Sequence, residues 1–264
     1  MMKRFMVFAL SLTLIMVLGF MVMAGDNSLD KIREKGKFVV GLDDTFAPMG
    51  FRDEEGNLVG FDIDLARVTA ERMGVEVEFK PVDWDGVILS LRSGMIDVIW
   101  NGLTITEERA KQINFTDPYM NNRQVIVVQM NSPIQTKADL AGKVVGLQMG
   151  SSSVNALYSD PELVQSLKDI RQYATNAEAL MDLQIGRLDA VVVDEMHGRY
   201  YYISKKPDVY RVLDEELGWE QYGVGVRKED ESFLAELNRV LDELKADGTA
   251  EELSIKWFGE NVID

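Results

Sequence analysis

The chain of 264 residues contains no cysteine and only one histidine, His197. The absence of cysteine excludes disulfide bonds, thiolate metal sites and cysteine nucleophiles. With a single histidine, no nucleophile–base pair and no cluster of metal ligands is evident in the sequence. We therefore expect no cofactor, no bound metal and no catalytic turnover.

Basic residues are also scarce, because 28 lysines and arginines stand against 44 acidic residues and give a net charge of −16. Nucleic acid needs basic patches and is therefore not an expected partner. The negative charge does not by itself predict a cationic ligand, since most of these carboxylates are expected at the solvated surface.

A long hydrophobic run occurs only at the N-terminus, where Lys3 and Arg4 precede an apolar stretch over residues 5–23. A basic start, an apolar middle and the small residues Val22 and Ala24 predict a secretory signal peptide, residues 1–24, cleaved after Ala24. The alternative is an uncleaved membrane anchor, because the run is almost long enough to span a bilayer. No lipid-attachment cysteine follows, so we expect a free periplasmic protein whose mature charge would be −18.

The sequence repeats a unit of helix, glycine and apolar strand, since aligning Gly94 with Gly186 also places Asp97 on Asp189. Two copies of a βαβ arrangement predict an α/β protein with two parallel-sheet lobes. The alternative is one six-stranded doubly wound sheet. We expect lobe 1 to comprise residues 25–118 plus 223–264 and lobe 2 residues 124–217. Two hinge crossings are expected near residues 119–123 and 218–222.

Two loops that follow predicted strands have features of anion sites. In the first, residues 101–110, Thr106 is expected to cap a helix that carries Arg109, whose planar guanidinium can bond both oxygens of a carboxylate. In the second, residues 148–153, glycine and serines at a helix start leave backbone N–H groups free for an anion. The alternatives are a surface arginine and a plain serine N-cap.

A third loop begins at Asp194, the acidic end of an otherwise apolar strand. Asp194 is a candidate for holding an ammonium group; the alternative is a helix cap followed by Glu195 on the surface. Together the three loops predict a receptor for a zwitterion between two lobes. Phe46 and Trp84 occupy corresponding loops of the first lobe and are expected to pack on the ligand, with core packing as the alternative.

Several segments together resemble periplasmic amino-acid-binding proteins of polar amino-acid ABC transporters, solute-binding protein family 3. They are GLDDTFAPM (41–49), GFDIDLA (60–66), NGLTITEER (101–109), FTDPY (115–119), VGLQMGSSS (145–153), GRLDAVVVDE (186–195), YGVGVRKED (222–230) and DGTAEELSIKWFG (247–259). The resemblance covers nearly all of residues 36–260. It implies the two-lobed type II periplasmic binding protein fold and delivery of a polar L-amino acid to a membrane ABC permease.

The resemblance also implies roles for single residues. The α-carboxylate is expected at Arg109, Thr104 and the backbone of Ser152 in the 148–153 loop, which also contains Ser151. The α-ammonium is expected at Gly102 and Asp194.

The remaining implied contacts concern the ligand side chain. Phe46 and Trp84 match the family's aromatic walls, and Asn101 and Gln148 occupy selectivity positions. Asp43 matches a position that faces the side chain in members that prefer basic ligands. The predicted ligand is therefore basic (arginine, lysine or histidine), with glutamine, asparagine and cystine as alternatives. Val193 replaces a histidine of similar glutamine binders, which disfavours glutamine.

The main functional alternative is an enzyme, because the same family includes periplasmic dehydratases similar to cyclohexadienyl dehydratase. Glu195 is the candidate general acid for that alternative, although we expect it to face solvent.

Overall fold

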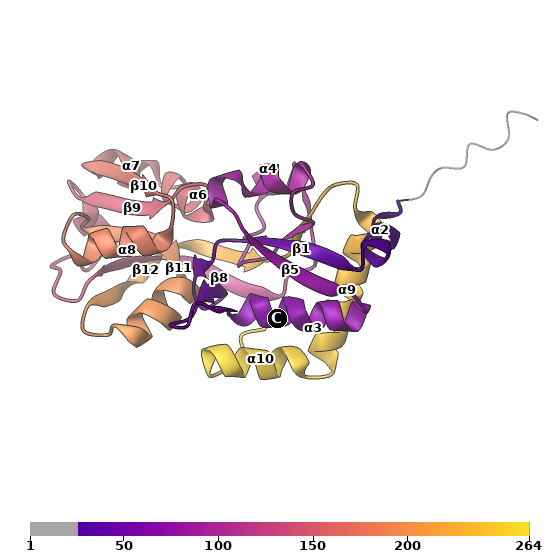
Figure 1. The fold of residues 1–264 in the computed structure, drawn as a ribbon. Helices are drawn as coiled ribbons and strands as arrows, with labels where there is room; N and C mark the ends of the chain where they lie inside the picture. Colours follow the sequence, from indigo (N-terminus) through magenta and orange to yellow (C-terminus); the bar gives the residue numbers. More distant parts are fainter. Residues whose placement is uncertain (1–25, 264) are drawn as a thin grey trace, which may run out of the picture.

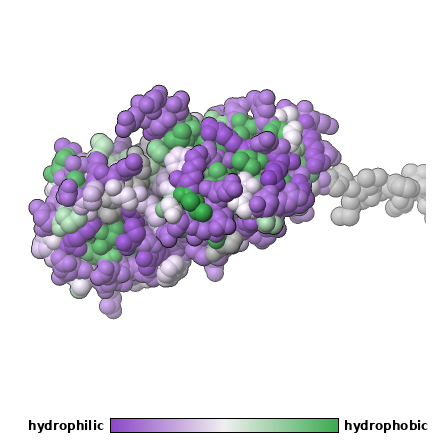
Figure 2. Space-filling model, turned by 90° about the horizontal axis from the view of Figure 1, so that it is seen from below, coloured by the Kyte–Doolittle hydropathy of each residue, from purple (hydrophilic) through white to green (hydrophobic). Residues whose placement is uncertain are grey.

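The computed structural model describes residues 26–263 and has an α/β architecture with two lobes (Figure 1). The predicted signal peptide lies outside the described residues. Within residues 26–263 no helix is long and apolar enough to cross a membrane. Hydrophilic side chains cover most of the face shown in Figure 2, as the high charge of the sequence leads one to expect.

The first lobe is built on a five-stranded sheet in which β1 runs parallel to β5 and β6, while β13 is antiparallel to β6 and β7. In spatial order the strands are β5 (Glu76–Pro81), β1 (Lys37–Leu42), β6 (Val98–Ile99), β13 (Gly225–Val226) and β7 (Asn114–Phe115). A small antiparallel sheet adjoins it, with strands β2 (Thr45–Phe46), β3 (Gly50–Arg52) and β4 (Leu58–Val59).

Both faces of the first sheet are covered, because side chains of a strand alternate between its faces. Phe38 and Val40 of β1 join a core with four helices, whereas Val39 joins a second core with Val87 and Leu91. The four helices are α2 (Ser28–Lys35), α3 (Phe61–Met73), α9 (Glu231–Ala246) and α10 (Thr249–Phe258). The shorter helices of this lobe are η1 (Trp84–Gly86), α4 (Val87–Arg92) and α5 (Glu107–Ala110).

The second lobe contains another five-stranded sheet, in which β9 is parallel to β10 and β11, and β8 is antiparallel to β11 and β12. In spatial order the strands are β10 (Asp169–Tyr173), β9 (Val144–Gln148), β11 (Ala190–Asp194), β8 (Met120–Gln129) and β12 (Tyr210–Tyr222). Its helices are η2 (Lys137–Leu140), α6 (Ser152–Tyr158), α7 (Pro161–Ser166), α8 (Asn176–Gln184) and the π-helix η3 (Met196–Ile203).

The stretches predicted as hinge crossings belong to, or directly precede, the long strands β8 and β12. These strands pair with each other, with Met120 opposite Tyr222 and Arg123 opposite Trp219. Tyr222 also forms an isolated bridge with Thr104 of the first lobe. The two strands therefore connect the lobes side by side as one ribbon.

Two separate sheets show that the alternative of a single doubly wound sheet is wrong. The repeat is visible in the contacts, because the Asp97 carboxylate accepts the Val39 N–H at 2.9 Å and Asp189 accepts the Val144 N–H at 2.8 Å. Beyond the predicted parallel strands, each sheet includes antiparallel ones. The antiparallel strands β8, β12 and β13 lie next to the segments that pass between the lobes. Antiparallel neighbours, unlike parallel ones, need no crossover helix to connect them.

Candidate functional site

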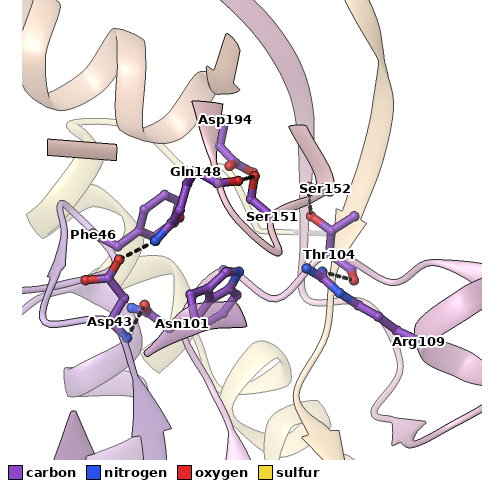
Figure 3. A pocket seen from close by; sticks show the side chains of 11 residues that line it. Asp43, Phe46, Asn101, Thr104, Arg109, Gln148, Ser151, Ser152 and Asp194 are labelled. Carbon is purple, nitrogen blue, oxygen red and sulfur yellow. Dashed lines mark hydrogen bonds between the residues drawn. The ribbon is translucent and has the colours of Figure 1, made fainter. Parts of the chain in front are cut away.

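One cavity between the lobes collects all the residues that the sequence singled out as ligand contacts. It is lined by Asp43, Phe46, Trp84, Asn101, Gly102, Thr104, Arg109, Gln148, Ser151, Ser152 and Asp194. That these residues bind a ligand remains a prediction, but the fold brings them together (Figure 3).

Arg109 is held at the cavity by a short capped helix. The Thr106 side chain accepts the Arg109 N–H at 3.1 Å, so the predicted N-cap is confirmed. The guanidinium donates to the carbonyls of Thr104 at 2.8 Å and Gly150 at 3.1 Å. These bonds use two of its five N–H donors. Arg109 is only 9% exposed, so the alternative of a surface arginine is wrong.

Asp194 forms an acidic wall of the same cavity at the end of β11. Its Oδ1 accepts the Asn122 amide at 2.7 Å and the Tyr222 hydroxyl at 2.8 Å. Burial raises the pKa of Asp194, and the nearby charge of Glu220 raises it further, against the lowering effect of Tyr222 and Arg109. A bound ammonium group would stabilise the ionised carboxylate, because opposite charge favours the charged form.

Asp43 provides a second carboxylate, which lies across the cavity from Arg109 in Figure 3. Its Oδ1 accepts the Thr45 N–H at 2.9 Å and the Thr45 hydroxyl at 2.7 Å, while Oδ2 accepts the Gln148 amide at 2.7 Å. Asn101 Oδ1 accepts the Asp43 N–H at 3.0 Å. Burial raises the pKa of Asp43, whereas the bonds from Thr45 and Gln148 lower it. The two predicted selectivity residues thus bond directly to Asp43.

The apolar walls serve both the cavity and the core. Phe46 and Trp84 are buried in the hydrophobic clusters on opposite faces of the first sheet and also line the cavity. The Phe46 ring stacks on His197 with centroids 4.8 Å apart. His197 Nδ1 contacts the Ala47 carbonyl at 2.5 Å, and burial lowers the pKa of His197 to about 4. A neutral imidazole from the second lobe therefore supports the aromatic wall of the first.

Contacts across the cavity join the lobes directly. The Thr104 and Ser152 hydroxyls lie 3.0 Å apart, and Arg109 and Asp43 each bond to a residue of the second lobe. Gly150 lies so close to the first lobe that a β-carbon there would come within 2.6 Å of the Asp85 Cα. Ser151 does not cap helix α6 with its side chain, since its hydroxyl donates to the Gln148 carbonyl at 2.7 Å.

The sequence reasoning missed four polar residues that surround the cavity from the strands β8 and β12. Asn122 and Tyr222 bond to Asp194, while Gln124 and Glu220 bond to Ser152. These strands were recognised as crossings, but strand pattern alone does not show which side chains face the site. The pairing of residues 120–122 with 220–222 brings them together.

Asp62, in the GFDIDLA segment, also lacked an assigned role. Its carboxylate is completely buried, accepts the Gly102 N–H at 2.7 Å and accepts the Tyr119 hydroxyl at 3.0 Å. Burial raises the pKa of Asp62 to about 7, although these hydrogen bonds lower it. Asp62 thereby fixes the turn that carries Gly102 into the cavity wall.

The expectation that Glu195 faces solvent is wrong, because this residue is only 9% exposed. Its carboxylate forms ion pairs with Arg123 at 2.6 Å and Arg199 at 2.7 Å. Burial raises the pKa of Glu195, but the two arginines lower it by more. Glu195 also does not line the cavity. Both facts make it unsuitable as the general acid of a dehydratase.

The fold and the cavity are those of a two-lobed receptor for a small solute. The family model for bacterial extracellular solute-binding proteins, family 3, matches residues 38–260. The chain belongs to this family and is a solute-binding protein of amino-acid ABC import.

Relatives with different ligands support this assignment. The L-cystine-binding protein TcyJ of Escherichia coli strain K12 is 36% identical over 241 residues, covering 90% of this chain and 89% of the relative. The lysine/arginine/ornithine-binding periplasmic protein of the same strain is 34% identical over 230 residues, covering 84% and 88%. The crystal structure of an ABC uptake transporter substrate binding protein from Streptococcus pneumoniae with bound histidine has a TM-score of 0.87 and 39% identity, covering 91% and 99%.

Proposed function

We propose that the cavity captures a free polar L-amino acid, by its α-carboxylate at Arg109, Thr104 and the backbone of Ser152 and by its α-ammonium at Asp194. The observation that carries the proposal is the presence of a buried guanidinium and a buried carboxylate, from opposite lobes, in one cavity. Burying a zwitterion is favourable only if both of its charges are paired.

The proposed mechanism is closure of the lobes about the β8–β12 ribbon. A ligand that contacts both lobes stabilises the closed arrangement by its differential affinity for it. The membrane permease then receives the closed, loaded protein. In this proposal the lobe boundaries follow the two sheets, with lobe 1 at 25–118 and 223–264 and lobe 2 at 124–217.

We propose a basic side chain for the ligand, with cystine and glutamine as alternatives. The support is the charge of the site, where Asp43, Asp194 and Glu220 are balanced by Arg109 alone. Among the relatives, those named for lysine, arginine and ornithine and the structure with bound histidine fit this choice, while TcyJ is named for cystine. A cationic side chain would reduce the excess negative charge around Asp43.

The test is a thermal-shift screen of all amino acids followed by calorimetry, since a ligand that binds only the native state raises the melting temperature. Arg109→Ala should raise Kd by roughly 30- to 3,000-fold, because removing one partner of a buried charge pair costs about 2–5 kcal/mol. Arg187→Ala is the control, since its side chain is 66% exposed and forms only a surface ion pair. Near-native affinity of Arg109→Ala would overturn the assignment.

We propose a binding role without turnover rather than the dehydratase alternative. The support is the ion-paired state of Glu195, the acid that the alternative needs. Incubation with prephenate or arogenate separates the two functions. Measurable consumption of either compound that is lost in Glu195→Gln would overturn the binding role.

A further inference from the structure

Glu220, on the strand β12 that connects the lobes, lies behind the cavity wall and has so far contributed only its negative charge to the site. The Oε2 atom of Glu220 accepts hydrogen bonds from four donors in three parts of the molecule. They are the Thr104 hydroxyl at 3.0 Å, the Asn122 amide at 3.1 Å, the Gln124 amide at 2.9 Å and the Ser152 hydroxyl at 3.2 Å. Thr104 belongs to the first lobe and Ser152 to the second.

These contacts determine where the two hydroxyl hydrogens point. A hydroxyl has one hydrogen, and an ionised carboxylate only accepts hydrogen bonds and is the stronger acceptor available. If Thr104 and Ser152 both donate to Glu220, their hydrogens are turned away from the cavity. The hydroxyl oxygens then offer lone pairs to the ligand, so its α-carboxylate would be held by Arg109 and by the backbone N–H groups of Thr104 and Ser152.

Glu220 also adds negative charge beside the ammonium end of the cavity. The Asn122 amide nitrogen donates to Asp194 at 2.7 Å and to Glu220 at 3.1 Å, so its NH₂ group bridges the two carboxylates. The charged or titratable groups that act on Asp194 are Glu220 and Tyr222 from β12 and Arg109 from α5. Only Arg109 among them is cationic.

We propose that Glu220 is a positioning residue of the amino-acid site, which orients the Thr104 and Ser152 hydroxyls as acceptors and makes the subsite around Asp194 selective for an ammonium group. This inference rests on the proposed function and extends it to a residue that does not touch the ligand. The oriented hydroxyls and the added negative charge would both strengthen binding of a ligand with a free primary ammonium. Neither would strengthen binding of a ligand with a neutral group in its place.

The substitution Glu220→Gln tests the proposal, because it keeps the length of the side chain but removes the charge and introduces donor hydrogens. At a pH well above the midpoint of binding for both proteins, Kd for the amino acid found in the screen should rise about tenfold or more. The pH at which binding is half lost should move to lower pH, because the Glu220 charge raises the pKa of Asp194 and that contribution disappears. Damage to packing alone would weaken binding without moving this midpoint.

The matched control is Asp214→Asn, which removes one negative charge from an exposed position on the same strand. It should leave both Kd and the pH midpoint at their wild-type values. An unchanged Kd in Glu220→Gln, or a weakened Kd with an unmoved midpoint, would overturn the proposal.

A second variant covers the case in which Glu220→Gln does not fold, as judged by circular dichroism. Glu220→Asp keeps the charge but withdraws the carboxylate from the two hydroxyls, so Kd should rise while the pH midpoint stays in place. Wild-type affinity of Glu220→Asp would contradict the orienting role. If the wild-type protein binds no amino acid at all, the proposed function itself fails, and the inference about Glu220 fails with it.

Discussion

The two lobes share a framework but differ at the strand ends that face the cavity. In each lobe an aspartate that follows the repeated glycine turn accepts a backbone N–H of the neighbouring parallel strand, Asp97 from β1 in the first lobe and Asp189 from β9 in the second. At the cavity, the turn after β6 leads to Arg109, whereas β11 ends in Asp194. The repeated unit thus provides two similar supports, and the divergent ends provide opposite charges. A zwitterion needs both lobes.

A large effect on Kd, comparable with that of Arg109→Ala, is expected from removing the acidic half of this difference. Asp194→Asn should raise Kd by roughly 30-fold or more, because the α-ammonium would then be buried without a counter-charge, at a cost of about 2 kcal/mol or more. Calorimetry measures the loss, and Asp208→Asn, at an exposed position of the same lobe, serves as control. A ligand held equally well by Asp194→Asn would point to a different pocket.

A smaller effect is expected where the lobes touch. Gly150→Ala should raise Kd about tenfold, because the new β-carbon would meet the Asp85 backbone and oppose closure. Gly142→Ala is a matched control, since Gly142 has a similar positive φ of 72° but open space around it. Both variants should lose some stability from backbone strain. Equal Kd values for the two variants would show that the approach to Asp85 does not limit closure.

The smallest effects on binding are expected in the framework. Asp97→Asn should reduce the free energy of unfolding by about 2 kcal/mol, because the buried Asp97 carboxylate also bonds Lys35 and Arg227. Asp189→Asn should cost only about 1 kcal/mol, since the Asp189 side chain is 39% exposed. Denaturant unfolding measures both, and neither should change Kd by more than about twofold. A large change in Kd would show that framework and site are not separable.

The two lobes and the candidate residues Arg109 and Asp194 could be predicted from patterns in the sequence, whereas Asp43, Asn101 and Gln148 were implied by the family resemblance. Thr106 before Arg109 is a local capping signal. The sequence repeat aligns Val193–Asp194 with Asn101–Gly102, and this alignment is a pattern of spacing. Glu220 and Asn122 were missed because they reach the site only through the pairing of two strands about 100 residues apart. That pairing is a tertiary feature.

Glu195 shows a second limit of the sequence. Its position after an apolar strand indicated a surface carboxylate, but Arg123 from another strand and Arg199 from the following π-helix enclose it. Burial of a carboxylate is tolerable when it is paired, and the partners cannot be recognised from the local pattern. The GFDIDLA segment is similar, since only the structure shows that Asp62 supports Gly102.

The most direct test of the zwitterion clamp is calorimetry of the identified amino acid, its carboxamide and its deaminated analogue against the wild type, Arg109→Ala and Asp194→Asn. The wild-type protein should bind each analogue at least roughly 30-fold more weakly than the amino acid. Arg109→Ala should no longer discriminate against the carboxamide, and Asp194→Asn should no longer discriminate against the deaminated analogue. The zwitterion clamp would be contradicted if the wild-type protein bound either analogue as tightly as the amino acid, or if both variants still discriminated against the analogues as the wild type does.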